Sequence, residues 1–311
     1  MIEGQEGVTW EQWLALAGAC EEHGVGTLFR SDHYVSFSDP ERAGSLDAWT
    51  TIAALAARTT TLRLGTLVSP ATFRHPSVLA KSVVTADHVS DGRVELGLGA
   101  GWMVAEHEQY GFAFPPTSER VSMFAEQLEI VARSWTEEQL DFEGRHYQLR
   151  GLSALPRSVQ QPHPPLIVGG SAKPGTLLPA ARWADEYNTT FATVDDLRER
   201  RARFDHALRE ANRDPGTMRF SLMTGLVVGE TRADALDRAR ELHAREARDD
   251  GFDDWLHHYS KTSLVGSVDE VGERLRAIAA VGVDRVMLQH LLHEDLEPVR
   301  LIGRELAPGL A

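Results

Sequence analysis

Three short stretches of the chain carry residues whose types and spacing could do chemistry. Ser31-Asp32-His33 sets a carboxylate beside an imidazole, and such a neighbour favours the charged imidazole and fixes its orientation, which suits a proton donor or an anion-binding group. Gly97-Leu98-Gly99-Ala100-Gly101-Trp102 has glycines spaced by two, which let a ligand lie against the backbone, and a tryptophan with a flat apolar face. Gly169-Gly170-Ser171 leads into a predicted helix, whose N–H groups and dipole can hold an anion.

Each stretch also has a purely structural explanation. Asp32 could simply begin a loop, and the glycines at 97–101 could make room for tight packing. Gly170-Ser171 could be a left-handed turn with a serine helix cap. The residues alone leave the first two alternatives open, and for the third we favour anion binding, with Lys173 adding charge nearby.

The elements that must position these stretches follow from the spacing of apolar residues. Helical spacing recurs at residues 10–22, where Thr9 and Gln12 can form a capping box, and at 76–89, where Pro76 suits the first turn. Short apolar runs bounded by turn residues lie between the helical segments. We predict strands at residues 27–29, 62–68, 94–98, 166–168, 186–190, 220–228 and 285–288, and each chemical stretch follows one of them.

Strands that alternate with helices predict a parallel sheet connected by right-handed crossovers. About eight such units in 311 residues fit an α/β fold of the (β/α)8 TIM barrel type. An open doubly wound sheet is the second choice, because the first strand-to-helix turn lacks the glycine fingerprint of dinucleotide-binding folds. A barrel places its site at the carboxyl ends of the strands, so the three stretches are expected to meet there. Its first strand would be short, since only Met1 and Ile2 precede Glu3-Gly4.

One segment interrupts the alternation. Residues 135–165 follow the fourth strand and its helix, and they contain a hairpin-like piece at 142–147 and a proline-rich run at 161–165. Long excursions after a barrel strand often cover the mouth, so we expect this insertion near it. No repeat and no low-complexity linker appears, which predicts a single domain over residues 1–311.

The composition narrows the possible partners. The chain carries 32 Lys and Arg against 46 Asp and Glu, a formal charge of −14, so it has no bulk electrostatic reason to bind nucleic acid or an anionic membrane. No apolar stretch is long enough to span a bilayer, and Met1 is followed by an acidic rather than a basic segment. We therefore expect a cytoplasmic protein whose partner is a small-molecule substrate.

Metal and serine chemistry are not expected. The only cysteine, Cys20, cannot form a disulfide within the chain or a multi-thiolate metal site. His290 and His293 come closest to metal-ligand spacing, but no His-Glu-x-x-His motif is present. The Gly-x-Ser-x-Gly motif of a serine nucleophile elbow is also absent.

The order of several stretches resembles the bacterial-luciferase-like superfamily of flavin- or deazaflavin-dependent oxidoreductases, and more closely its branch that uses coenzyme F420. The resemblance extends from about Gly4 to Gly309. Single motifs are loose, whereas their ordered succession is specific. The matching stretches are Ser31-Asp32-His33, residues 56–59 and 62–68, Phe73-Arg74-His75-Pro76, Leu79-Ala80-Lys81, residues 97–102 with Glu106, residues 142–147 and residues 164–171.

The resemblance implies a TIM barrel with the cofactor ring in its mouth. Coenzyme F420 is the expected cofactor and FMN the alternative. His33, with Asp32 beside it, would be the catalytic acid or base, and a non-prolyl cis peptide would join Leu67 and Val68 behind the ring. A homodimer is also implied as a possibility. The implied cofactor-binding residues are Asp32, Thr66, Leu67, Val68, Gly99, Ala100, Gly101, Trp102, Glu106, Gly169, Gly170 and Ser171.

Two positions depart from the sugar-phosphate dehydrogenases of that family. Trp102 stands where some of them have a glutamate, and Phe37 stands where they have a tryptophan. We therefore expect a larger and more apolar substrate, and we favour reduction of a conjugated C=C or C=N bond. An FMNH2-dependent monooxygenase that uses O2 is one alternative, and a flavin-binding protein without turnover is another.

Overall fold

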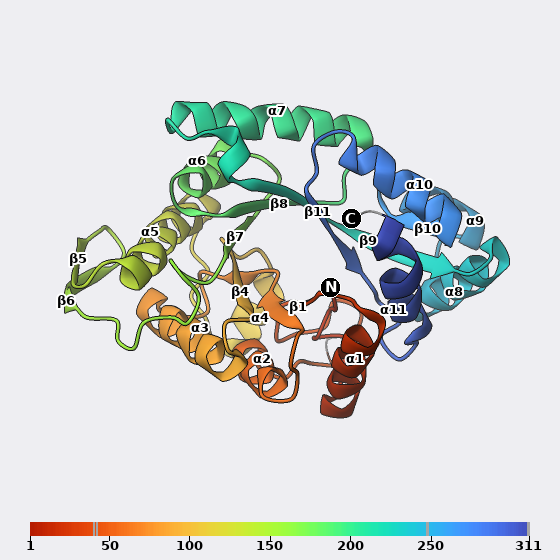
Figure 1. Cartoon of the computed structure of the whole chain (residues 1–311), viewed down its shortest axis with the longest axis horizontal. Helices are drawn as coiled ribbons and strands as arrows, with labels where there is room; N and C mark the ends of the chain where they lie inside the picture. Colours follow the sequence, from red (N-terminus) through yellow and green to blue (C-terminus); the bar gives the residue numbers. More distant parts are fainter. Residues whose placement is uncertain (40, 42, 247–248, 310–311) are drawn as a thin grey trace.

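The computed structural model describes residues 1–39, 41, 43–246 and 249–309. The central strands form one parallel sheet, in the order β1-β2-β4-β7-β8-β9, with β11 also paired to β9 (Figure 1). The strands are β1 (Thr27–Arg30), β2 (Arg63–Thr66), β3 (Ser69–Pro70), β4 (Val94–Gly99), β5 (Leu140–Glu143), β6 (Gln148–Leu152), β7 (Leu166–Gly169), β8 (Glu186–Thr190), β9 (Arg219–Gly229), β10 (Leu264–Ser267) and β11 (Arg285–Gln289).

Helices surround this sheet on its outer side (Figure 1). They are α1 (Trp10–His23), α2 (Ala48–Ala56), α3 (Pro76–Ser90), α4 (Val104–Tyr110), α5 (Thr117–Thr136), α6 (Pro174–Trp183), α7 (Val194–Glu210), α8 (Arg232–Arg245), α9 (Phe252–Thr262), α10 (Val268–Ala279) and α11 (Glu297–Leu301), with short turns at Pro215–Thr217, Ile302–Leu306 and Ala307–Gly309. No helix in the described part of the chain combines the length and apolar character needed to cross a membrane.

The first residues fill the gap between β1 and β11. The Ile2 amide donates to Phe29 O at 3.0 Å, and the His290 amide donates to Met1 O at 3.0 Å. Ile2 also forms a parallel bridge with Arg30. The parallel sheet is thereby nearly closed into a barrel, so the predicted barrel with a short first strand is confirmed and the open doubly wound sheet is wrong.

Local signals in the sequence set several element ends as predicted. Thr9 and Gln12 form the capping box of α1, and the left-handed Gly24 ends that helix. Pro76 occupies the first turn of α3, whose C-cap Asp91 is left-handed at φ 56°. These caps set the residues at which α1 and α3 begin and end.

The predicted insertion lies away from the mouth. Strands β5 and β6 form an antiparallel hairpin that packs on the outer side of α5 (Figure 1). The Glu126 carboxylate of α5 holds this hairpin by accepting hydrogen bonds from the Arg145, His146 and Tyr147 amides. No residue of 135–165 lines the cavities that we describe below at the carboxyl ends of the strands.

A second excursion was not predicted and does reach the mouth. The long strand β9 continues past its pairing with β11, and its second half pairs with β10, from Leu264↔Leu226 to Ser267↔Gly229. Helices α8 and α9 connect the two strands. Strand β10 runs directly into the Ser267 cap of α10, so no turn residues separate the strand from the helix and mark its end in the sequence.

The barrel interior holds a charged network below the site. The Arg285 guanidinium bridges Glu95 at 2.7 Å and Glu186 at 3.0 Å, and Arg63 donates to Glu95 at 2.7 Å. Burial alone would raise the pKa of Glu95, but the hydrogen bonds from Arg285 and Arg63 lower it. Burial raises the pKa of Glu186 despite the same guanidinium. Arg285 is therefore the cation on which both buried carboxylates depend.

Arg285→Leu should destabilise the fold strongly. The substitution leaves Glu186 without its guanidinium and Glu95 with Arg63 alone, and removing one partner of a buried ion pair costs about 3–5 kcal/mol. Urea unfolding followed by circular dichroism measures the change. The control is Arg203→Leu, which breaks an exposed pair with Glu199 and should cost less than about 1 kcal/mol. Equal losses in the two variants would show that the network contributes little.

Candidate functional site

A cavity of about 430 Å³ opens at the carboxyl ends of the strands. The ends of β1, β4 and β7 meet around it, so the three stretches that the sequence singled out converge. Its lining comprises Glu3, Ser31, His33, Phe37, Leu67, Val68, Pro70, Gly99, Ala100, Gly101, Trp102, Gly169, Gly170, Thr176, Asn188, Thr190, Phe191, Met223 and Gln289.

His33 is the titratable imidazole in this wall. It follows β1 after the strand has ended at Arg30, so it is free of the strict alternation of a regular strand. Its Nδ1 lies 2.9 Å from Oε1 of Glu106, a fully buried carboxylate on α4. The Tyr34 amide donates to the other Glu106 oxygen at 3.2 Å. Glu106 thereby fixes the ring, and Nε2 is the nitrogen that stays available for another partner.

The surroundings of His33 favour the charged imidazole. Burial works against the charge, but the hydrogen bond that the His33 ring donates to Glu106 and the negative charges of Glu106, Glu3 and Asp32 raise the pKa of His33 above its usual 6.5. A group whose pKa is raised on folding stabilises the fold fully below pH 6.5, and this contribution fades as the pH rises through the folded-state value. Glu106 therefore favours the protonated form of this imidazole.

The carboxylate that orients His33 is not the one beside it in the sequence. Asp32 is buried and accepts hydrogen bonds from the Ser69 hydroxyl and from Arg74 Nη1, both at 2.6 Å. The expectation that Asp32 fixes the orientation of the imidazole is therefore wrong, because the Asp32 carboxylate binds Arg74 instead. The same guanidinium also binds Asp47 at 2.6 Å, at the start of α2. Asp32 is therefore linked through Arg74 to α2 and through Ser69 to β3.

Glu106→Gln should lower the pKa of His33. The amide removes both the negative charge and the charge-assisted hydrogen bond that raise the pKa in the native protein, while burial, which lowers it, remains. An NMR titration of the His33 ring measures the shift directly. Glu108→Gln, an exposed change on the same helix, is the control and should leave the value unchanged. An unchanged pKa in Glu106→Gln would contradict the assigned electrostatics.

Aromatic side chains form the rim of the cavity. The His33 ring meets Phe37 edge-on at a centroid distance of 5.0 Å and Trp102 at 5.6 Å, and the latter two lie 5.4 Å apart. Trp102 is 63% exposed, Phe37 46% and Phe191 41%. Large apolar side chains gathered at one opening and left in water indicate a binding site for a ligand with apolar faces.

The floor of the cavity is built around Val68. The peptide bond Leu67-Val68 is cis, which confirms the expectation drawn from the resemblance. A Cβ atom added at Gly97, Gly99 or Gly169 would come within 2.9, 2.6 or 3.0 Å of a Val68 methyl group. The packing explanation of the glycine run is therefore correct for Gly97 and Gly99, which leave room for Val68, although Gly99 also lines the cavity.

The anion site predicted at Gly169, Gly170 and Ser171 has only part of the expected geometry. Gly169 and Gly170 line the cavity, but Ser171 is exposed and lies outside the lining. The turn uses a left-handed Ala172 at φ 55°, and the N-cap of α6 is Lys173 rather than a serine. The amides of Gly170 and Ala172 already donate to Asn188 O and the Tyr187 hydroxyl.

Four predicted cofactor residues therefore do not line the cavity. The buried Thr66 donates to Gly97 O at 3.0 Å, Asp32 and Glu106 are held by Arg74 and His33, and Ser171 faces outward. The structure adds lining residues to which the sequence interpretation gave no role of their own, namely Glu3, Ser31, Pro70, Thr176, Asn188, Thr190, Phe191, Met223 and Gln289. Most sit in or just after β8, β9 and β11, so the strand-end rule applied to every strand would have indicated them.

The histidines closest to a metal-ligand spacing do not form a site. The buried His290 is bonded through Nε2 to Asp295 O at 2.8 Å. No group of three or more His, Cys, Asp or Glu side chains placed to hold a metal occurs among residues 1–39, 41, 43–246 and 249–309.

The parallel barrel, the cis peptide after β2 and the strand-end cavity define a barrel protein of the luciferase-like type. A profile of the luciferase-like monooxygenase family matches residues 2–285, and the chain belongs to this family. This finding confirms the family that the sequence resembles.

Relatives of this chain include enzymes that use either of two cofactors. It is 27% identical over 284 residues to the FMNH(2)-dependent dimethylsulfone monooxygenase of Pseudomonas putida, covering 82% of this chain and 76% of that one. It is 34% identical over 184 residues to the F420-dependent glucose-6-phosphate dehydrogenase of Nakamurella multipartita, covering 58% of this chain and about half, 52%, of that relative. The crystal structure of monooxygenase RslO1 from Streptomyces bottropensis has a TM-score of 0.82 at 25% identity, covering 97% and 94% of the two chains. Of these relatives, the Pseudomonas putida enzyme is FMNH(2)-dependent and the Nakamurella multipartita enzyme is F420-dependent.

Proposed function

We propose that the chain is an oxidoreductase that binds coenzyme F420 in the cavity at the strand ends. In this proposal a hydride passes between C5 of the deazaflavin and a small organic substrate. His33 acts as the acid or base, or stabilises developing charge. The observation that carries the proposal is the 2.9 Å bond between His33 and the buried Glu106, which sets a charged imidazole in the wall of a cavity rimmed by Trp102 and Phe37.

The cavity suits a planar heterocycle. Its volume of about 430 Å³ lies within the range of small-molecule sites, about 300–1,000 Å³. Leu67, Val68 and Met223 offer apolar surface to the faces of a ring, while Asn188 and Gln289 offer amide groups to its polar edge. The bare backbone at Gly99 lets a flat ligand approach closely.

The protein's contribution is placement and proton handling, because the cofactor supplies the hydride chemistry when it is bound. His33 holds a proton at Nε2 on the wall of the cavity, and Glu106 keeps the ring in one orientation. Trp102 and Phe37 stand exposed at the mouth, where a bound ring would cover them and displace water from beside the imidazole. A charged His33 suits protonation of the substrate, and so supports reduction as the direction.

The phosphate-bearing tail would lie beyond β7. The start of α6 offers the dipole of a ten-residue helix, and no hydrogen bond within the described chain uses the Ser171 or Gly175 amides. The exposed Lys173 adds a positive charge. Of the anion site at Gly169, Gly170 and Ser171 that the sequence suggested, the Ser171 amide thus remains available, whereas the Gly170 amide already donates to Asn188 O.

An FMNH2-dependent monooxygenase is the second candidate. The match to the Pseudomonas putida relative favours it, because that match covers 82% of this chain, whereas the match to the F420-dependent dehydrogenase covers 58%. The same cavity would hold the isoalloxazine ring, and His33 would then stand beside the position where O2 reacts. A protein that binds a flavin without turnover is the third candidate.

A side-by-side titration with F420 and with FMN, each oxidised and reduced, tests the proposal. Absorbance and fluorescence report binding, and we expect F420 to bind at least about tenfold more tightly. A preference for reduced FMN would favour the monooxygenase. Tight binding without turnover of any C=C or C=N substrate would favour the non-catalytic protein, and failure of both cofactors to bind would contradict the whole assignment.

A further inference from the structure

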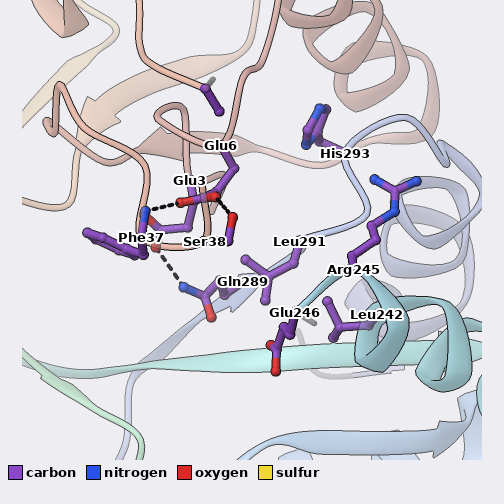
Figure 2. Close-up of a pocket in the computed structure, with 11 residues that line it drawn as sticks. Glu3, Glu6, Phe37, Ser38, Leu242, Arg245, Glu246, Gln289, Leu291 and His293 are labelled. Atoms are coloured by element: carbon purple, nitrogen blue, oxygen red, sulfur yellow. Dashed lines mark hydrogen bonds between the residues drawn. The ribbon is translucent and has the colours of Figure 1, made fainter. Parts of the chain in front are cut away.

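A second cavity, of about 470 Å³, adjoins the first and shares Glu3, Phe37 and Gln289 with it. Four parts of the chain that lie far apart in sequence line it: the segment of Glu3 and Glu6, the loop around Phe37, the end of α8, and the end of β11 with the residues after it (Figure 2). The unpredicted excursion between β9 and β10 thus supplies one wall. Leu242 and Leu291 give this cavity apolar surface.

Glu3 stands in the wall between the two cavities. It is 7% exposed, and both of its carboxylate oxygens accept hydrogen bonds from neutral amides: Oε1 from Gln289 Nε2 at 2.6 Å, and Oε2 from Gln5 Nε2 at 2.9 Å. In the described part of the chain no ion pair reaches this carboxylate. The charge of Glu3 also acts on the His33 imidazole and on the Met1 ammonium, but its direct hydrogen-bond donors are both neutral. A buried carboxylate is costly unless hydrogen bonds and positive charge together balance it.

The other charged groups of the second cavity have partners within the protein. Glu6 accepts hydrogen bonds from the Phe37 amide and from the Ser36 and Ser38 hydroxyls. Arg245 forms ion pairs with Glu241 at 2.7 Å and Glu294 at 2.6 Å.

Two further titratable groups complete the lining. Glu246 accepts from the Trp255 indole at 3.0 Å. Burial lowers the pKa of His293, so this imidazole adds no positive charge near neutral pH. Glu3 is therefore the buried carboxylate that lines both cavities and whose direct hydrogen-bond donors are neutral amides.

We propose that the second cavity is the substrate chamber and that it takes an apolar molecule bearing one cationic nitrogen, a protonated amine or an iminium, which Glu3 binds. As a statement about substrate, this inference rests on the proposed function. Because Glu3 lies in the wall that the two cavities share, the cationic nitrogen of the ligand would lie beside the candidate cofactor cavity. Phe37, Leu242 and Leu291 would contact the apolar part of the ligand.

Three probes of one shape and different charge test this chamber. Benzylamine, benzyl alcohol and benzoate are titrated into the full chain at pH 7, with and without bound F420, and binding is measured by ligand-observed NMR. A charge-assisted hydrogen bond to a buried carboxylate predicts that benzylamine binds about tenfold or more tightly than the alcohol, and that benzoate binds most weakly.

Substitutions locate the effect. Glu3→Gln keeps the shape and should remove the preference for benzylamine, whereas Glu199→Gln, which removes an equal charge from the exposed face of α7, should keep it. Leu291→Trp fills the chamber without touching the carboxylate and should abolish binding of both benzylamine and benzyl alcohol. Thermal melting of each variant verifies that it is folded.

The opposite outcomes overturn the inference. Equal binding of amine and alcohol, a preference that survives Glu3→Gln, or no binding of any probe would each show that Glu3 does not select a cation. The measurement is independent of the cofactor titration. Binding of F420 without amine selectivity would refute only the substrate class, whereas amine selectivity without cofactor binding would refute only the proposed function.

Discussion

His33→Ala should lower turnover by about 100-fold or more while cofactor affinity stays within about threefold. The imidazole is the group in the cavity wall that Glu106 holds in its charged form, and acid–base catalysis by a positioned side chain contributes about 10²–10⁴-fold. The cofactor ring keeps its apolar floor at Val68 and its backbone contacts at Gly99 in this variant. Steady-state kinetics with an identified substrate and a binding titration measure the two quantities.

The control for this experiment is His206→Ala, an exposed change on α7 that should leave both quantities unchanged. Glu106→Gln should lie between the wild type and His33→Ala, because it weakens the proton donor without removing it. The double variant should be no slower than His33→Ala alone, since the two residues act as one unit. Wild-type turnover in His33→Ala would remove this residue from the mechanism.

Removing the cofactor phosphate should weaken binding by about 100-fold or more. The amides of Ser171 and Gly175 at the start of α6 and the Lys173 ammonium are the groups available to an anion there. Two charge-assisted hydrogen bonds at about 1.5–3 kcal/mol each give at least this factor. Riboflavin against FMN, and the dephosphorylated deazaflavin against F420, are the matched ligand pairs for a fluorescence titration.

Lys173→Ala should reduce the discrimination between phosphorylated and dephosphorylated cofactor. The control is Lys261→Ala, an exposed lysine of α9 that does not line the cavity, and it should leave the discrimination unchanged. Equal affinities for both members of each ligand pair in the wild type would place the tail elsewhere and refute the phosphate site at α6.

Much of the fold was predictable because it depends on short-range signals. The capping box at Thr9 and Gln12 and the proline that opens α3 each act within one turn of helix. The alternation of strands and helices follows from apolar spacing, and the rule that barrel sites lie at strand ends then brings His33, Gly99 and Gly169 to one cavity.

The pairing of side chains was not predictable in the same way. Glu106 is 73 residues from His33 in the sequence, and only the folded loop after β4 brings it to the imidazole. Asp32 is adjacent to His33 in the sequence, but its carboxylate forms an ion pair with Arg74. Which carboxylate meets which base depends on loop geometry, which apolar periodicity does not describe.

The arrangement of the loops was also beyond the sequence pattern. A single left-handed residue, Ala172, turns Ser171 away from the cavity that the glycines before it line. The sequence shows no turn between β10 and the helix that follows it, so this strand was not predicted. The contribution of α8 to the wall of the second cavity was therefore not predicted either.

The size of the side chain at Val68 sets the depth of the candidate cofactor cavity. Its methyl groups occupy the space that Gly97, Gly99 and Gly169 leave open, so a single side chain supports the ends of both β4 and β7. Trimming it to alanine would deepen the floor without altering the aromatic rim or His33, and lengthening it would press on the backbone of both strands. A protein engineer who wants this barrel to accept a different ring system has, at Val68, a control separate from the proton chemistry.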